Sequence, residues 1–269
     1  MKNDILEFAL SLAQAAEAEI LPVYRKCAVH WKPDGTEVTD ADRRAEEVMR
    51  EIIAKRMPGH QVLGEEYGGP DSPTREPLWV LDPIDGTRSF ALGLPIFGTL
   101  IGYLENGEPQ AGVIHFPAMG ETVYAARGSG CWMRLRDEAP QPARAAGTTD
   151  VRSAYLSACG VNPSDIDPAP SGPCYKLSAL IRHARRFRFV SDCVQHALVA
   201  EGRLDAAVDA IMNPWDIAAI VPCVEEAGGV VTDLEGQREN IVWRSSLLSS
   251  ATPALHGEIL SILRSGRKQ

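Results

Sequence analysis

The chain has 269 residues, enough for one large domain or two smaller, tightly packed ones. With 45% hydrophobic and 23% charged residues, its composition is ordinary for a soluble globular protein. The formal net charge of −9 argues against a non-specific nucleic-acid binder, which needs positive charge to neutralise phosphates. An acidic protein can still take a phosphate substrate if metal ions supply positive charge locally.

The sequence favours a cytoplasmic protein with no membrane and no nucleic-acid partner. Asp4, Glu7 and Glu17 interrupt the apolar stretches that an export signal would need. No later run approaches the roughly 20 apolar residues of a membrane span. The six cysteines are scattered without a C-x-x-C pair, which predicts buried thiols in a reducing compartment.

The first half of the chain predicts two helices followed by a meander of strands. Apolar residues recur at spacings of three and four from Ile5 to Ile20, which indicates an amphipathic helix. A second helix is expected from Asp40 to Ile53, with Thr39 as its N-cap. Strands are expected at 61–63, 78–81, 97–103, 111–116, 122–126 and 131–135, with a hairpin turn at Glu105-Asn106-Gly107.

The second half alternates between strands and helices. Residues 140–150 predict a polar connection between an N-terminal half (1–140) and a C-terminal half (141–269), packed as one compact catalytic unit. Strands are expected at 154–159, 188–190 and 204–208, and helices at 175–183, 192–201 and 217–227. This alternation indicates a layered α/β architecture.

The segment Asp82-Pro83-Ile84-Asp85-Gly86-Thr87 carries the clearest chemical signal. Two carboxylates three residues apart follow an apolar strand, in a turn that proline and glycine make compact. Such a turn can direct both carboxylates, a backbone carbonyl and the Thr87 hydroxyl at one point, and hard oxygen ligands of this kind suit Mg²⁺. The alternative is a solvated acidic turn, since Asp, Pro and Gly are common turn residues.

Two other acidic motifs are excluded by spacing. An EF-hand loop needs carboxylates at alternate positions and a glutamate at the twelfth, where this chain has Gly93. The covalent phosphatases of the haloacid-dehalogenase type resemble D-x-D-x-T, with aspartates two apart, whereas Asp82 and Asp85 are three apart. The nucleophile is therefore not expected to be an aspartate.

Three further acidic positions extend the possible constellation. Glu65 follows a short strand and could ligate a metal, or it could be a surface glutamate. Asp42 lies in the first turn of the second predicted helix and Asp216 at the start of a later one. Capping a helix terminus is the competing explanation for both aspartates.

These pieces together resemble the inositol monophosphatase superfamily of Mg²⁺-dependent phosphatases. The resemblance lies in Gly64-Glu65-Glu66, in Trp79 to Thr87, and in Trp215 to Ala219 with the later Glu226 to Gly229. It covers the chain from the first helix to about Asp233. It implies a layered αβαβα sandwich, and members of the family are commonly homodimers.

The resemblance also implies a mechanism built on two metal ions. Glu65, Asp82 and the Ile84 carbonyl would hold one Mg²⁺, and Asp82, Asp85 and Asp216 a second; a third, weaker ion would lie near Glu65. Hydroxide formed on the Glu65 side, oriented by Thr87 and Asp42, would attack phosphorus directly. No phosphoenzyme is needed.

Within the family, Arg88-Ser89-Phe90 and Pro95 to Ile101 look most like the branch that hydrolyses histidinol phosphate in histidine biosynthesis. Two positions depart from that branch: Val194-Gln195-His196 replaces an aromatic pattern, and Asp209 stands where a glutamate is usual. Inositol-1-phosphate or a broad range of sugar phosphates is the alternative substrate. A catalytically silent protein acting through protein or RNA contacts is a third hypothesis. The predicted substrate contacts are Gly86, Thr87, Arg188, Asp192, Asp209 and Asp216.

Overall fold

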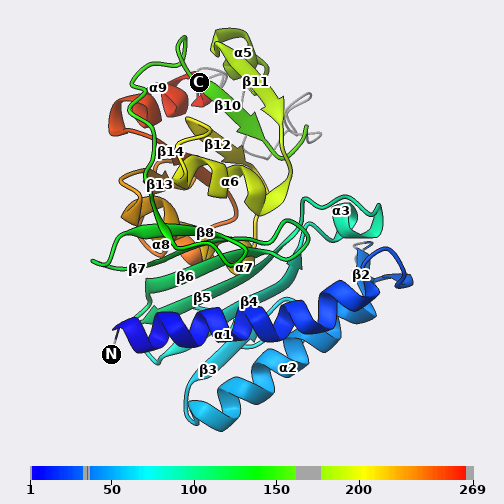
Figure 1. The fold of residues 1–269 in the computed structure, drawn as a ribbon. Coiled ribbons are helices and arrows are strands. Elements are labelled where there is room, and N and C mark those ends of the chain that lie inside the picture. Colours follow the sequence, from blue (N-terminus) through cyan, green and yellow to red (C-terminus); the bar gives the residue numbers. More distant parts are fainter. Residues whose placement is uncertain (1, 33–34, 36, 162–176, 265–269) are drawn as a thin grey trace.

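Five alternating layers of helix and sheet make up the molecule (Figure 1). The computed structural model describes residues 2–32, 35, 37–161 and 177–264. Tyr175 and Lys176, at the start of one predicted helix, and Cys174 lie outside the described residues. The observed αβαβα sandwich is the architecture that the sequence predicted.

The first two layers are a pair of helices and a seven-stranded sheet. Helices α1 (Lys2–Ile20) and α2 (Asp40–Arg56) pack on one face of the sheet, whose strand order is β3-β4-β5-β6-β7-β8-β9. Among the described strands of this sheet, β3 and β4 pair in parallel and all the other neighbours are antiparallel. The strands are β3 (Gln61–Gly64), β4 (Leu78–Asp85), β5 (Gly98–Glu105), β6 (Glu108–Phe116), β7 (Glu121–Ala126), β8 (Cys131–Leu135) and β9 (Gln141–Ala143).

Three helices form the middle layer: α6 (Asp192–Ala200), α7 (Pro214–Ile217) and α8 (Ile220–Glu226). They separate the large sheet from a five-stranded sheet of order β11-β10-β12-β14-β13, whose outer side is covered by α5 (Leu177–His183) and α9 (Pro253–Arg264) (Figure 1). The strands of this sheet are β10 (Tyr155–Ala158), β11 (Arg186–Phe189), β12 (Ala206–Asp209), β13 (Val230–Thr232) and β14 (Leu247–Ser250). None of the helices in the described ranges is long and apolar enough to cross a membrane.

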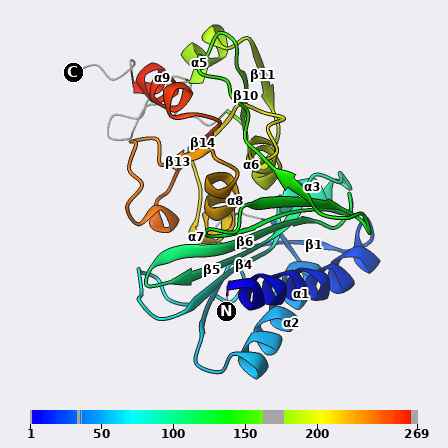
Figure 2. The same ribbon diagram turned by 60° about the vertical axis from the view of Figure 1, so that its left-hand side comes forward.

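The remaining elements are short. A hairpin of β1 (Val29–Trp31) and β2 (Glu37–Thr39) leads into α2, and the five-residue helix α3 (Thr87–Ala91) follows the end of β4. Two 3₁₀ turns, Leu21–Val23 and Ile241–Trp243, complete the described elements. The turned view in Figure 2 shows α1 and α2 on the side of the large sheet opposite to the C-terminal half.

Most predicted elements are confirmed, and the differences have physical causes. Asn106 and Gly107 both adopt positive φ in the predicted hairpin turn, as a two-residue hairpin connection requires. The helix predicted at 217–227 was wrong in its bounds, because the chain forms α7 and α8 with a break between them. Strand β9 lies inside the predicted polar connection. Strands β13 and β14 and helix α9 were not predicted from the sequence.

The junction between α7 and α8 packs closely against two glycines of the large sheet. Gly102 on β5 and Gly112 on β6 are paired partners in adjacent strands. A Cβ added at Gly102 would lie 2.5 Å from the Ala218 Cβ, and one at Gly112 would lie 2.2 Å from the Ala219 carbonyl oxygen. The backbone that follows Asp216 can therefore approach the sheet only where both side chains are absent.

We expect Gly112→Val to lower the free energy of unfolding by about 3 kcal/mol, because overpacking forces the α7–α8 junction off the sheet. Urea denaturation would measure this. Gly147→Val is the matched control, since nothing lies within 4 Å of a Cβ at that position. Equal stability of the two variants would contradict this account of how the junction packs on the sheet.

Candidate active site

A bulge at the end of β4 brings Asp82 and Asp85 to the same side of the chain. In a regular strand, residues three apart point to opposite faces of the sheet. Here the pairing shifts between Asp82, opposite Leu100, and Asp85, opposite Gly98. The Thr99 hydroxyl donates a 2.8 Å hydrogen bond to the Pro83 carbonyl and fixes the bulged segment.

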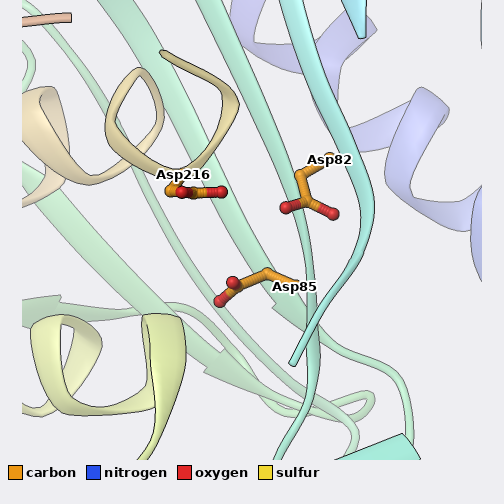
Figure 3. A group of neighbouring side chains, drawn as sticks. All are labelled: Asp82, Asp85 and Asp216. Carbon is orange, nitrogen blue, oxygen red and sulfur yellow. The ribbon is translucent and has the colours of Figure 1, made fainter. Parts of the chain in front are cut away.

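Asp216 approaches this strand end from α7. It is the third residue of that helix, and its Oδ2 accepts a 2.6 Å hydrogen bond from the Asn213 backbone N–H. One carboxylate oxygen from each of Asp82, Asp85 and Asp216 lies within 4.8 Å of the others. Figure 3 shows the three side chains around a common space. Two distant parts of the chain thus build one cluster of three carboxylates.

The cluster has the properties of a cation site. Burial raises the pKa of Asp82 well above its ordinary value, and the charges of Glu65, Asp85 and Asp216 raise it further. Burial likewise raises the pKa of Asp85, and that of Asp216 to about 7. Asp82 is 2% exposed, and its Oδ1 has no hydrogen-bond partner in the part of the chain that the structure describes. Buried, mutually repelling carboxylates with a free oxygen fit a divalent metal ion, which would supply the missing partner and charge.

Glu65 lies beside the cluster, in the turn after β3. Its backbone N–H donates to the Leu81 carbonyl at 3.2 Å, which ties this turn to β4. The buried Glu46 of α2 accepts hydrogen bonds from the N–H groups of Glu66 and Tyr67, at 2.7 and 3.2 Å. Glu46 therefore holds the turn that presents Glu65, a role that the sequence did not reveal.

Lys32 is a second residue that sequence reasoning missed. Its Nζ lies 2.9 Å from Glu65 Oε1 and 2.6 Å from Glu66 Oε1. Burial disfavours the ammonium, but the hydrogen bonds to Glu66 and Glu65 prevail and raise the pKa of Lys32 above its ordinary value. A single lysine outside the acidic motifs gives no sequence signal for such a contact.

Asp42 both caps α2 and reaches the active-site turn. Its Oδ2 accepts from the Thr39 N–H at 2.8 Å, which forms a capping box with the predicted N-cap Thr39. Its Oδ1 accepts from the Thr87 hydroxyl at 3.3 Å, while that hydroxyl also lies 3.0 Å from the Ile84 carbonyl oxygen. Burial raises the pKa of Asp42 to about 6. Asp42 therefore caps α2 with one carboxylate oxygen and contacts Thr87 with the other.

The turn after β4 packs closely against the start of α6. Gly86 adopts φ of +85°, and a Cβ there would lie 2.8 Å from Asp192 Oδ2. Asp192, the first residue of α6, itself has a left-handed φ of 56°, which is uncommon outside glycine. The Arg88 side chain instead points outward and pairs with Glu37 at 3.2 Å, a surface ion pair.

The predicted alcohol-binding residues divide into two groups. Asp192 and Asp209 lie beside the cluster. The charge of Asp209 raises the pKa of Asp216. Burial raises the pKa of the Cys159 thiol, and the charges of Asp209 and Asp192 raise it further. Arg188 is exposed, and its Nε donates to the Tyr155 hydroxyl at 2.9 Å. No contact between Arg188 and the carboxylate cluster occurs among the residues described, and its role in substrate binding stays a prediction.

Asp209 is in contact with the α6 segment Val194-Gln195-His196, the other predicted departure from the histidinol-phosphate branch. Its Oδ2 accepts a 2.5 Å hydrogen bond from Gln195 Nε2 and lies 2.9 Å from His196 Nε2. Nothing in the sequence connects these two positions, which lie on different elements. In the fold they form one group.

A layered α/β sandwich with a carboxylate cluster beside its middle helices defines a class of metal-dependent phosphatases. The sequence profile described as the inositol monophosphatase family matches residues 1–268. Among relatives, the histidinol-phosphatase of Chlorobaculum parvum is 38% identical, with 98% of each chain covered. That of Mycobacterium tuberculosis is 35% identical, covering 99% of this chain and 100% of its own. A solved Thermotoga maritima IMPase has 30% identity and a TM-score of 0.83, with 97% of each chain covered.

The chain belongs to the inositol monophosphatase family. It is a phosphoric monoester hydrolase, and its acidic cluster could bind metal. The family and the phosphatase class predicted from the sequence motifs are thereby confirmed.

Proposed function

We propose that the protein is a Mg²⁺-dependent histidinol-phosphatase, which hydrolyses L-histidinol phosphate to L-histidinol and phosphate. The observation that carries the chemistry is the Asp82–Asp85–Asp216 cluster, with its buried, unpartnered carboxylate oxygen. The substrate is supported by the whole-chain likeness to two histidinol-phosphatases.

The donor set supports two Mg²⁺ ions that share Asp82. Asp82, Asp85 and Asp216 would hold one ion; Glu65, Asp82 and the Ile84 carbonyl would hold the other, with a third, weaker site near Glu65. When bound, Mg²⁺ neutralises charge on the phosphate oxygens and lowers the pKa of a coordinated water toward neutrality. Lys32 contacts Glu65 and Glu66 in the structure, so its ammonium would have to move or share Glu65 with an ion.

The protein's own groups position the reactants. The Thr87 hydroxyl, held by Asp42 and the Ile84 carbonyl, is placed to orient the attacking water. The backbone N–H groups of Gly86 and Thr87, at the turn that begins α3, would bind the phosphate oxygens. The water oxygen would form a bond to phosphorus as the bond between phosphorus and the alcohol oxygen breaks. The proton that the water loses balances the one that the alcohol oxygen takes up, so the products are the free alcohol and phosphate.

Two carboxylates beside the cluster support a substrate whose alcohol portion carries positive charge. Asp192 and Asp209 lie within electrostatic reach of the metal ligands and of each other, but they are not needed as ligands in the two-ion scheme. Histidinol carries an ammonium and an imidazole, which such carboxylates would attract. An uncharged inositol ring would not compensate these two charges.

Hydrolysis of inositol-1-phosphate or of several sugar phosphates is the second candidate. The IMPase likeness of the solved Thermotoga structure favours it, as does Asp209 in place of the longer glutamate. We also propose a cytoplasmic homodimer. The five cysteines in the described ranges are free thiols, which suits a reducing compartment, and the dimer rests on the family resemblance alone.

A substrate panel tests the proposal. We expect initial phosphate release from histidinol phosphate, with saturating Mg²⁺, to have a kcat/KM at least about 100-fold above that for inositol-1-phosphate, because two carboxylate contacts to cations are each worth roughly tenfold or more. Fructose-1,6-bisphosphate and adenosine 3′,5′-bisphosphate complete the panel. Comparable rates on all four would move the assignment to the broad-specificity candidate.

A further inference from the structure

The Asp209 carboxylate is fixed by two buried side chains of α6. Gln195 Nε2 and His196 Nε2 both face the same oxygen, Oδ2, at 2.5 and 2.9 Å. Since a carboxylate can only accept, the Nε2 of His196 carries the proton. No hydrogen bond to the other oxygen, Oδ1, occurs among the residues described, so that oxygen is available to a ligand.

The network continues from His196 into the five-stranded sheet. His196 Nδ1 lies 2.7 Å from Ser249 Oγ on β14, whose neighbour in the sheet is β12, the strand that ends at Asp209. Gln195, His196 and Ser249 are all fully buried. Hydrogen bonds in such surroundings are stronger than at the surface and hold one geometry. Asp209 itself is 7% exposed, so its carboxylate has few alternative orientations.

We propose that Gln195, His196 and Ser249 are positioning residues that set the specificity of the site for a cationic alcohol. They hold the short Asp209 side chain in one orientation and leave Oδ1 for an ammonium or imidazolium group. This inference rests on the proposed function. It accounts for the two side chains of α6 that meet at one oxygen of Asp209.

The same sheet offers a matched control. Ser250, the neighbour of Ser249, is also buried, and its Oγ lies 2.7 Å from Nδ1 of His256, a residue of α9. His256 Nε2 lies 2.8 Å from the Thr232 hydroxyl. His256 is thus a buried histidine with a serine partner, on the outer side of the sheet, and no carboxylate of the described residues contacts it.

The test compares histidinol phosphate with phenyl phosphate, whose alcohol is uncharged, at saturating Mg²⁺. In His196→Leu we expect the ratio of the two kcat/KM values to fall about tenfold, through a higher KM for histidinol phosphate with kcat little changed. His196→Gln retains an N–H donor and should recover most of the ratio. His256→Leu should leave the ratio unchanged.

A second variant tests the same network if His196→Leu does not fold. Gln195→Met removes the other donor, and it also removes Oε1, which is buried and has no hydrogen-bond partner in the described part of the chain. It should fold and lower the ratio about as much as His196→Leu, since each loses one charge-assisted hydrogen bond. If folded Gln195→Met matches the wild-type ratio while Asp209→Asn lowers it, the network does not set specificity.

The same data separate this inference from the proposed function. A wild-type ratio near one would overturn the proposed function before any variant is measured. A high wild-type ratio that survives Gln195→Met and His196→Leu would overturn the positioning role alone. A ratio that falls equally in His256→Leu would also overturn it, because buried histidines in general, and not this network, would then be responsible.

Discussion

Replacing Asp82 by asparagine is expected to lower kcat by roughly 1000-fold or more, because Asp82 is the ligand that both proposed metal ions share. Asparagine has nearly the same shape but no charge, so metal affinity should fall with activity. The fold should survive, since β4 keeps its pairing on both edges. Without metal the variant should be at least as stable as the wild type, because one of several repelling carboxylates is gone.

Steady-state phosphate release at increasing Mg²⁺, together with thermal unfolding in a chelator, would measure both effects of Asp82→Asn. Asp71→Asn is the control, because Asp71 is an exposed aspartate whose only side-chain hydrogen bond within the described ranges comes from the adjacent Ser72. Wild-type turnover of Asp82→Asn at saturating Mg²⁺ would rule out the two-ion assignment.

The second large effect expected is on stability as a function of pH. Burial raises the pKa of Asp216 to about 7 and that of Asp42 to about 6, from ordinary values near 3.8. Between these values the metal-free folded state binds protons that the unfolded state has released. The contribution of these protons to the free energy of unfolding is therefore fully present below about pH 4, and it is lost as the pH rises through 6 and 7. The combined loss should be on the order of a few kcal/mol.

Mg²⁺ can replace the lost protons, so it should raise the melting temperature much more at pH 8 than at pH 5. Melting curves at both pH values, with chelator and with saturating Mg²⁺, would measure this difference. Other carboxylates titrate in the same range, and Asp216→Asn isolates the contribution of the cluster: its chelated form should lose less stability from pH 5 to 8 than the wild type. An equal loss in both proteins would contradict the assignment.

Local sequence signals predicted much of this fold. The capping box at Thr39 and Asp42 lies within four residues, and the hairpin turn at Asn106-Gly107 depends only on residues that tolerate positive φ. The strand–turn segment that ends at Thr87 was predicted as a carboxylate site for the same reason: its residues are adjacent in the chain. Such features are determined by neighbours and can be found without the tertiary structure.

Features that depend on distant contacts could not be predicted in this way. The backbone at Ala218 and Ala219 approaches the large sheet closely because Gly102 and Gly112 lack side chains, and neither glycine is near in sequence. The contact of Lys32 with Glu65 joins residues 33 positions apart. The contact of His196 with Asp209 crosses from a helix to a strand that pairs in a sheet. Each required the packing of separate layers.

The most direct test of the central claim is the initial rate of phosphate release from histidinol phosphate by protein freed of metal with a chelator, followed over a Mg²⁺ titration. We expect no turnover above background in the metal-free protein and full recovery on saturation with Mg²⁺, with Asp82→Asn inactive throughout. An unchanged rate in the metal-free protein would contradict the assignment of Asp82, Asp85 and Asp216 as a catalytic metal centre.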